Sequence, residues 1–301
     1  MTKVNNQDRV QELAGIHLGR KGGEGYSSIY DPNLLVAIPR TLNRESYGIE
    51  ENNLPFVGFD TWNAYEVSAI TKKGLPVSGL LKIVCPADSM YHVESKSIKL
   101  YLNSLNMTPL GETTKECINL IETTVSRDLT LLLGSPITCK LFTSEPREGY
   151  TFETFERIQE QIDLDKIEFT SYKSDASQLE LDKEQRTVQT RIDFLRSNCR
   201  VTNQPDFGDI FIFMKGQHVP TLESLAKYIV SHREVSHFHE EIVEMTYTDL
   251  LKKFEPEELM VCALYSRRGG VDINPIRASK KSLIPSWIYD ERVMMKKTLK
   301  Q

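Results

Sequence analysis

The chain has 301 residues, of which 40% are hydrophobic and 26% are charged, and its formal net charge at pH 7 is −5. This composition is typical of a soluble globular protein with room for two domains, and no apolar run reaches the roughly 18 residues that a membrane span needs. The negative balance argues against a broad nucleic-acid surface, and the polar start MTKVNNQDRVQEL, which lacks the apolar stretch of a signal peptide, favours a cytoplasmic protein.

The first half of the chain predicts two strands, two helices and a third strand, in that order. The first two strand-like runs are separated by the turn sequence KKGLP. In the longer helical pattern, Cys117, Ile121 and Val125 fall on one face, and Gly134 marks its expected end. The predicted strands span residues 56–70, 75–84 and 137–142, and the predicted helices span residues 94–106 and 113–134.

The second half repeats this order, although the two halves differ in sequence. Two helices can cover one face of an antiparallel sheet, so the pattern predicts an α+β protein with two such modules in tandem. The predicted strands span residues 187–198, 209–216 and 258–266, and the helices span residues 221–232, with Thr221 as expected N-cap, and 235–254. The expected domains are an N-terminal module at 1–144, an acidic connecting arm at 145–184 and a C-terminal module at 185–301.

Cys199 differs from the other cysteines in its surroundings. The five cysteines are far apart, and no C-x-x-C pair or His/Cys cluster indicates structural zinc, so we expect no metal. Cys117, Cys139 and Cys262 lie in apolar segments, where buried packing is expected. Cys199 instead lies in the polar run LRSNCRVTNQPDFGD, which makes it a candidate nucleophile.

A nucleophilic cysteine needs a group that removes its proton or favours its thiolate, because only roughly a few per cent of an ordinary thiol is ionised near pH 7. Asp206 follows Cys199 by seven residues, within a predicted Gln-Pro-Asp-Phe-Gly turn. A charged carboxylate would repel a thiolate, so Asp206 can assist only by taking the thiol proton or by already holding one to give. The alternative is that Asp206 caps a turn and Cys199 merely lies near it. Taken alone, the stretch favours this second interpretation.

Two stretches offer groups that suit phosphate. VESKS at 93–97 opens a predicted helix, whose free N–H groups and Lys96 suit an anion, although a solvated first turn is the simpler interpretation. In YSRRGGVDINPIR at 265–277, glycines allow close backbone approach and arginine forks fit phosphate. GRKGGEG at 19–25 lacks a preceding strand and fits no nucleotide-binding motif, so we expect a flexible loop there.

The stretch SHFHEE at 236–241 suits a planar base. A glutamate there can accept hydrogen bonds from a purine-like N–H edge, and Phe238 can stack on the ring. Two histidines and two glutamates also suggest a metal. However, His237 and His239 are two residues apart, which splays them on a helix, so a shared metal is not expected.

Taken together, SNCRVTNQPDFGD, ESKSIKLYLNSLN, FHEE and RRGGVDINPIR closely resemble the NADPH-dependent 7-cyano-7-deazaguanine reductases of the queuosine pathway, in their long two-module form. The resemblance extends to YDPNLLVAIPRTLNR and LPFVGFDTWNAYEVS and is weakest in the acidic arm. It implies tandem tunnelling-fold modules, with antiparallel sheets each backed by two helices, and a homodimer. It also implies reduction of a cyano group to an aminomethyl group with two NADPH, with no need for nucleic acid or a membrane.

The resemblance implies a role for each motif residue. Cys199 matches the nucleophile that forms a covalent thioimide, and Asp206 matches the proton donor. Phe207 stands where the family commonly has Trp, a change expected to affect packing more than chemistry. The positions that match the base-binding site are Val93, Glu94, Ser95, Phe238, His239 and Glu240, and those that match the NADPH site are Ser95, Lys96, Arg268 and Gly269.

Two other classes of protein remain open. One is a tunnelling-fold hydrolase or cyclohydrolase that acts on a purine or pterin and would usually need a zinc site built from Cys and His. The other is a non-catalytic purine-binding protein, in which Cys199 is incidental. Consumption of NADPH in the presence of 7-cyano-7-deazaguanine would separate the reductase from both.

Overall fold

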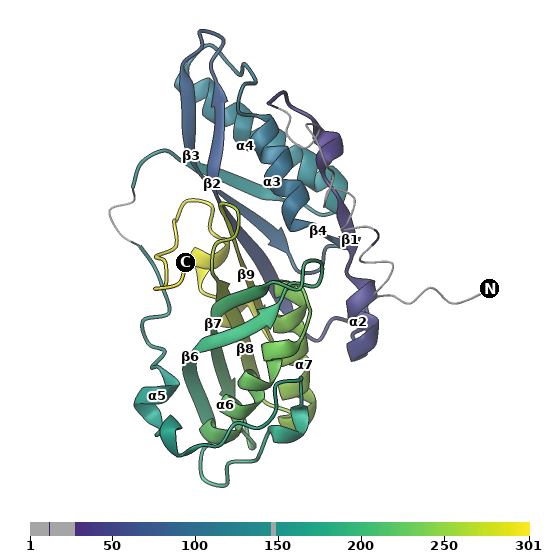
Figure 1. Cartoon of the computed structure of the whole chain (residues 1–301), viewed down its shortest axis with the longest axis vertical. Helices are drawn as coiled ribbons and strands as arrows, with labels where there is room; N and C mark the ends of the chain where they lie inside the picture. Colours follow the sequence, from purple (N-terminus) through teal and green to yellow (C-terminus); the bar gives the residue numbers. More distant parts are fainter. Residues whose placement is uncertain (1–11, 13–27, 146–148) are drawn as a thin grey trace, which may run out of the picture.

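The computed structural model describes residue 12, residues 28–145 and residues 149–301, so the loop predicted at 19–25 lies outside the described residues. Seven strands form one antiparallel sheet in the order β5-β3-β2-β9-β8-β7-β6 (Figure 1). These strands are β2 (Val57–Ile70), β3 (Pro76–Pro86), β5 (Thr138–Phe142), β6 (Thr187–Asn198), β7 (Pro205–Lys215), β8 (Glu258–Tyr265) and β9 (Val271–Ala278).

Two helices back each half of the sheet (Figure 1). α3 (Ser95–Ser104) and α4 (Thr114–Leu133) pack on β2, β3 and β5, whereas α6 (Leu222–Val230) and α7 (His239–Phe254) pack on β6, β8 and β9. The predicted α+β fold of tandem modules is confirmed. The shorter elements are β1 (Ala37–Pro39), β4 (Tyr91–Val93), α2 (Thr41–Tyr47), α5 (Ile158–Gln161), α8 (Ser286–Tyr289) and the 3-10 helices η2 (Pro32–Leu34), η3 (Leu164–Lys166), η4 (Ala176–Gln178), η5 (Ser231–Glu234) and η6 (Lys281–Leu283).

The long helices begin and end where their sequences indicate. Thr221 caps α6 by accepting a hydrogen bond from the backbone N–H of Ser224. Thr113 does the same for α4, which ends at Gly134 in the left-handed conformation (φ +65°) that glycine adopts without steric cost. The apolar stripe of α4 is fully buried against the sheet, so burial of this face positions the helix.

The sequence predicted no strand after residue 266, whereas the structure adds β9, which joins the two halves. β9 pairs with β2 along its whole length but with β8 only as far as Ile276. The ladder with β8 therefore ends next to Pro275, which has no N–H to donate. Asp272, Asn274 and Arg277 break the apolar pattern of this strand, yet all three are buried. A buried strand that carries so many polar groups does not show a hydrophobic period.

A buried ion network explains how β9 can carry a charge. Arg277 Nη1 lies 2.8 Å from Asp60 Oδ1 on β2, and its Nη2 lies 2.9 Å from Glu244 Oε1 on α7. Arg40 Nη2, at the start of α2, lies 2.6 Å from Asp60 Oδ2. Arg44 Nη2, within α2, lies 2.7 Å from Glu244 Oε1. Burial alone would raise the pKa of Asp60, but Arg277 and Arg40 outweigh it and hold that pKa below its usual range. The network ties α2, β2, β9 and α7 together.

The C-terminal segment, yellow in Figure 1, lies beside β9 and is anchored by Lys82 of β3. The Lys82 ammonium donates to the carbonyl oxygens of Trp287, Asp290 and Val293 at 2.6, 2.9 and 2.9 Å. Burial lowers the pKa of Lys82 to about 8. Three carbonyl acceptors replace the water that the ammonium loses on burial, and they hold the segment to the sheet.

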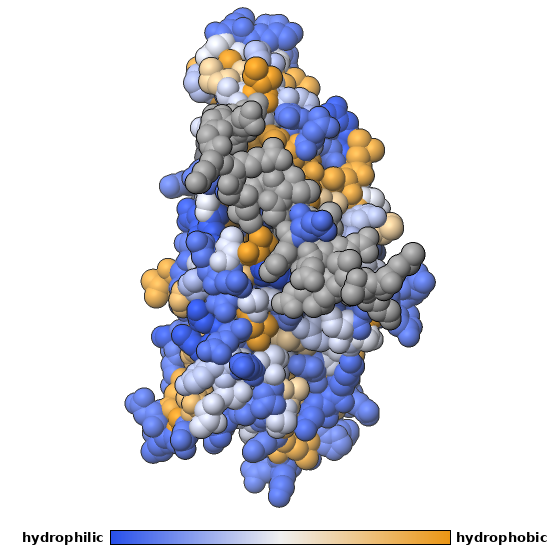
Figure 2. All heavy atoms as spheres, turned by 45° about the vertical axis from the view of Figure 1, so that its right-hand side comes forward, coloured by the Kyte–Doolittle hydropathy of each residue, from blue (hydrophilic) through white to orange (hydrophobic). Residues whose placement is uncertain are grey.

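The surface is mixed in character. On the face shown in Figure 2, hydrophobic residues are scattered among hydrophilic ones. Leu131, Met90 and Met107 are among the large apolar side chains that are more than half exposed. Within the described part of the chain, no helix is long and apolar enough to cross a membrane.

We predict that Glu244→Gln lowers the free energy of unfolding by about 3–5 kcal/mol, because it leaves the guanidinium groups around it short of a buried counter-charge. Glu223→Gln on α6, which removes a half-exposed partner of Lys227, should cost less than about 1 kcal/mol. Urea denaturation measures both. The arginines hold the pKa of Glu244 below its ordinary 4.5, against the effect of burial, so its contribution is present at neutral pH and declines as pH falls below about 4.5. Equal costs for the two variants would contradict the account of the network.

Candidate functional site

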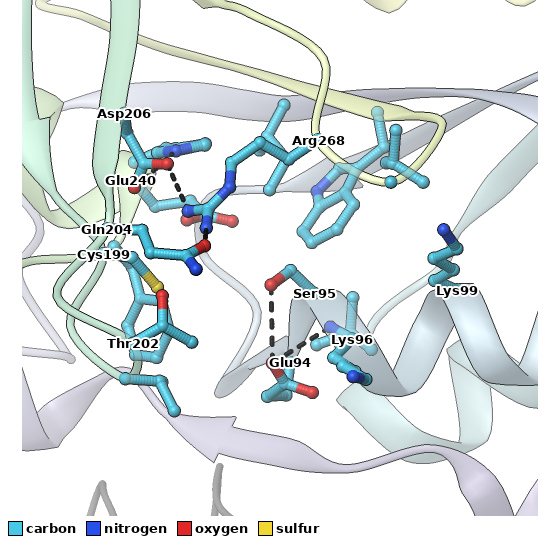
Figure 3. Close-up of a pocket in the computed structure, with 18 of the residues that line it drawn as sticks. Glu94, Ser95, Lys96, Lys99, Cys199, Thr202, Gln204, Asp206, Glu240 and Arg268 are labelled. Atoms are coloured by element: carbon cyan, nitrogen blue, oxygen red, sulfur yellow. Dashed lines mark hydrogen bonds and ion pairs between the residues drawn. The ribbon is translucent and has the colours of Figure 1, made fainter. Parts of the chain in front are cut away.

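A cavity of about 510 Å³ lies between the starts of α3 and α7, the turn before β7 and the loop before β9 (Figure 3). It brings together every residue that the sequence singled out for the site. These residues are Val93, Glu94, Ser95, Lys96, Cys199, Asp206, Phe238, His239, Glu240, Arg268 and Gly269. Both halves of the chain line the cavity, so neither half forms it alone.

Cys199 is the first residue of the turn that joins β6 to β7. Its backbone N–H donates to the carbonyl of Gln204 at 2.8 Å, and its own carbonyl accepts from Asn203 at 2.9 Å. Asn203 has φ +54°, in the left-handed region that Asn tolerates. The turn predicted around Asp206 is wrong, because β7 already begins at Pro205. Cys199 is partly exposed to the cavity, whereas the other four cysteines are buried.

Asp206 is a buried carboxylate between two cationic or potentially cationic groups. Its side chain is 4% exposed, its Oδ1 lies 2.5 Å from Arg268 Nη1, and its Oδ2 lies 3.3 Å from His239 Nε2. Burial alone would raise the pKa of Asp206, but His239 and Arg268 together lower it below its ordinary value. Asp206 is therefore a carboxylate at neutral pH, and the two neighbours that keep it ionised also make it a weaker base.

His239 lies between Asp206 and an aromatic ring. Its imidazole stacks on the Tyr265 ring, with centroids 3.8 Å apart and an angle of 6° between the planes. Its Nδ1 is buried and has no hydrogen-bond partner among the described residues. One ring nitrogen thus contacts Asp206, while the other can exchange a proton with a bound molecule.

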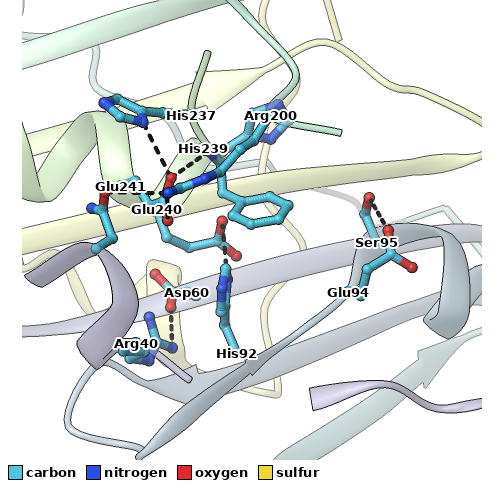
Figure 4. A network of polar contacts seen from close by, with 12 residues as sticks. Arg40, Asp60, His92, Glu94, Ser95, Arg200, His237, His239, Glu240 and Glu241 are labelled. Carbon is cyan, nitrogen blue, oxygen red and sulfur yellow. Dashed lines mark hydrogen bonds and ion pairs between the residues drawn. The ribbon is translucent and has the colours of Figure 1, made fainter. Parts of the chain in front are cut away.

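Glu240 is a buried carboxylate with spare hydrogen-bonding capacity (Figure 4). Its side chain is 3% exposed, and its Oε1 has no hydrogen-bond partner in the described part of the chain. Its Oε2 lies 3.8 Å from His92 Nδ1, which is too long for a hydrogen bond. Phe238 lines the same cavity, and its ring meets the His92 ring edge-on, with the ring centroids 4.8 Å apart. An unsatisfied buried carboxylate is costly, so this corner suits a ligand with N–H donors.

Glu94 has a role that the sequence did not reveal. Its Oε1 accepts a hydrogen bond from the Lys96 N–H at 3.0 Å, and its Oε2 accepts one from the Ser97 N–H at 2.7 Å. The side chain thus caps α3 and occupies two of the backbone N–H groups that a phosphate could otherwise contact. A carboxylate has further lone pairs, and Glu94 still lines the cavity.

Cationic side chains gather on the other side of the cavity. Figure 3 shows Lys96 and Lys99 on α3, opposite the wall that carries Cys199 and Asp206, and shows Arg268 reaching toward Asp206. Gly269 has φ +58°, and a Cβ there would lie 2.9 Å from Lys99 Nζ. Glycine adopts this left-handed conformation without steric cost, whereas the flexible end of Lys99 could move away from a Cβ.

Several cavity residues were not found from the sequence. Lys99 follows Lys96 by three residues, so helical spacing could have identified it. No signal marked Gln204, which lines the cavity, or His92 and Tyr265, which contact Glu240 and His239 without lining it, because their contacts come from distant segments. Phe207, the departure from the family pattern, is 43% exposed and does not line the cavity. Among the described residues, no group of three or more His, Cys, Asp or Glu is placed to hold a metal ion.

Fold and cavity define a two-module α+β protein whose pocket combines a thiol, a buried carboxylate and a cationic wall. Two family models match the chain: "Nitrile reductase, 7-cyano-7-deazaguanine-reductase N-term" over residues 26–141 and "QueF-like protein" over residues 205–283. The chain belongs to the two-module nitrile reductases of the QueF type. A crystal structure of the archaeosine synthase QueF-Like in its apo form is 18% identical, covers 33% of this chain and 94% of that chain, and gives a TM-score of 0.28.

We predict that Arg268→Met raises the pKa of Asp206, because the variant removes a guanidinium that stabilises the carboxylate. In the unchanged chain, carbon-13 NMR of labelled aspartate should show Asp206 titrating below the ordinary 3.8. Asp206→Asn assigns the signal. An Asp206 pKa that does not move in the Arg268 variant would contradict the geometry of the ion pair.

Proposed function

We propose that this chain reduces the nitrile of 7-cyano-7-deazaguanine to an aminomethyl group with NADPH, through a covalent thioimide on Cys199. One observation supports this proposal above the others. The thiol of Cys199, the buried carboxylate of Asp206 and the open carboxylate of Glu240 line the same cavity. Recognition of a base and covalent attack on its substituent both need these groups within reach of one molecule.

Base recognition falls to the corner around Glu240. A deazaguanine presents adjacent N–H donors on one edge, and these complement the Glu240 oxygen that has no hydrogen-bond partner among the described residues. Phe238 offers a ring face or edge to the planar base. Because an analogue without the N–H donors would leave a buried carboxylate unpaired, the corner favours guanine-like bases strongly.

Cys199 and Asp206 carry out the covalent step. As the sulfur bonds to the nitrile carbon, the thiol proton must leave, and the nitrogen of the opening C≡N bond must gain one. Asp206 is ionised before the reaction because Arg268 and His239 lower its pKa. It can therefore accept the thiol proton and then deliver it to the nitrogen. The product of this step is a neutral thioimide, and no proton is lost or gained overall.

The cationic wall fits a dinucleotide phosphate. Lys96 and Lys99 line one side of the cavity, and the Arg268 guanidinium lies beside Asp206; all three side chains remain partly exposed. Arginine and lysine are the usual partners of phosphate oxygens. Ser95 and Gly269 border the same side. NADPH bound there would supply hydride to the thioimide carbon, the C–S bond would then break to release Cys199 and leave an imine, and a second NADPH would supply hydride to the imine carbon while the nitrogen gains a proton. His239, whose Nδ1 has no hydrogen-bond partner among the described residues, is our candidate to move that proton.

The remaining expectations concern the assembly. We infer a homodimer, because the sheet ends in two edge strands, β5 and β6, at which copies of the chain can meet. The proposed domains are those at 1–144 and 185–301 with an arm between them. Light scattering of the purified chain measures the mass that decides the oligomeric state.

The direct test mixes the chain with NADPH and 7-cyano-7-deazaguanine and follows the nicotinamide absorbance. We expect two NADPH to be oxidised for each base, because a nitrile must gain two hydrides to become an amine. A guanine that lacks the nitrile serves as the control and should cause no oxidation. A folded chain that oxidises no NADPH with the nitrile would overturn the proposal.

Two substitutions separate the nucleophile from the proton carrier. Cys199→Ala should abolish the covalent adduct that intact-mass spectrometry detects without NADPH, whereas Cys85→Ala, which removes a buried thiol, should retain it. Asp206→Asn should slow turnover by about a hundredfold or more while the base still binds. An adduct that survives in Cys199→Ala would refute the assignment of the nucleophile.

Glu240→Gln should weaken binding of the base, because an amide presents one acceptor where the carboxylate presents two. Calorimetry in a Cys199→Ala background, where no adduct forms, should show a loss of about tenfold or more, equivalent to one charge-assisted hydrogen bond. Unchanged affinity would remove Glu240 from the base-binding corner.

A further inference from the structure

Arg200, the neighbour of Cys199, makes a buried contact that no step of the proposed reaction uses. Its side chain is 7% exposed, and its Nη1 lies 2.6 Å from Glu241 Oε1 on α7 and 3.3 Å from Asn43 Oδ1 on α2. Figure 4 shows Arg200 beside Glu241, next to Glu240. The turn that carries the thiol is thereby linked to the helix that carries the base-binding carboxylate.

Glu241 in turn fixes the first turn of α7. Its Oε2 accepts a hydrogen bond from the backbone N–H of Phe238 at 2.9 Å and lies 3.4 Å from His237 Nδ1. His237 Nε2 is 2.6 Å from the Tyr47 hydroxyl on α2. One carboxylate therefore sets the helix start that presents Phe238, His239 and Glu240 to the cavity.

The backbone hydrogen bonds between β6 and the segment before α7 end at Asn198, one residue before Cys199. Asn198, the last residue of β6, donates to Val235 O at 2.8 Å and accepts from His237 N–H at 3.1 Å. These bonds align the end of β6 with the segment before α7. Two residues further on, the ion pair of Arg200 with Glu241 links the turn to α7 itself.

We propose that Arg200 and Glu241 are positioning residues, which hold the sulfur of Cys199 at the right distance from the nitrile of a base bound by Glu240 and Phe238. Each partner is adjacent in sequence to a residue of the site, so a displacement of the pair moves both walls of the cavity. The inference rests on the proposed function and adds to it the element that sets the geometry of attack. Misplacement of reacting groups by about 1 Å can cost about a hundredfold in rate.

The pair is suited to this task because it is buried and directional. Burial alone would raise the pKa of Glu241, but His237 and Arg200 lower it to about 2, so the carboxylate stays charged throughout the neutral range. Two desolvated charges contribute little net stability, yet they strongly disfavour any arrangement that separates them. The expected effect of breaking the pair therefore falls on the geometry of the site.

The test is a double-mutant cycle of Arg200→Met, Glu241→Gln and the combined variant. Intact-mass spectrometry follows adduct formation at saturating base without NADPH, and calorimetry in a Cys199→Ala background measures the affinity for the base. We expect each single substitution to slow adduct formation by about tenfold or more. The double variant should be no slower than the slower single variant, because both changes break the same contact. Arg200→Met should leave the affinity within about twofold, and Arg200→Lys should recover part of the rate.

Arg191→Met is the matched control. It breaks an ion pair with Asp209 in the same β6–β7 hairpin, 2.7 Å long and partly buried, and neither residue lines the cavity. Its adduct rate should equal that of the unchanged chain, and thermal unfolding of every variant shows that it is folded. Slowing by Arg191→Met as large as that by Arg200→Met, or additive effects in the double variant, would overturn the positioning role. No adduct in the unchanged chain would instead overturn the proposed function.

Discussion

The buried guanidinium of Arg277 holds the two halves of the molecule together in one sheet. The pocket lies between these halves and depends on their being joined. It contacts Asp60 from the first half and Glu244 from the second at 2.8 and 2.9 Å, with no exposure to water. Hydrophobic packing alone could join the halves in several registers, whereas paired buried charges tolerate very few. The cavity takes its walls from both halves, so its shape depends on this junction.

Helix α7 shows how burial separates structural carboxylates from functional ones. Glu240, Glu241 and Glu244 lie within its first two turns, and all three are buried. Glu244 and Glu241 each face guanidinium nitrogens at 2.6 to 2.9 Å. Glu240 faces only an imidazole at 3.8 Å, and among the described residues its other oxygen has no hydrogen-bond partner. A buried carboxylate oxygen without a hydrogen-bond partner is costly, and the base that we propose for this pocket would remove that cost at Glu240.

The regular elements could be predicted because their cores are apolar and periodic, as in α4 and β6. β9 could not, since Asp272, Asn274 and Arg277 are buried by pairing with residues from distant segments. The motifs indicated the site residues, but not that Arg268 would bond Asp206 or that Glu94 would cap its own helix. Such partners arise from tertiary contacts, which a sequence pattern does not show. The protonation state of Asp206 depends on these partners, and the proposed proton transfer depends on that protonation state.

We propose that the pocket delivers two hydrides to the same carbon, the first while that carbon is bound to Cys199 as a thioimide and the second after its release as an imine. Turnover with NADPH deuterated at the transferable position of its nicotinamide ring tests this transfer, with the product examined by mass spectrometry. We expect an aminomethyl base with two deuterium atoms on the methylene carbon. An unchanged nitrile, or an amide formed by addition of water, would contradict it, and the amide would indicate a hydrolase in place of a reductase.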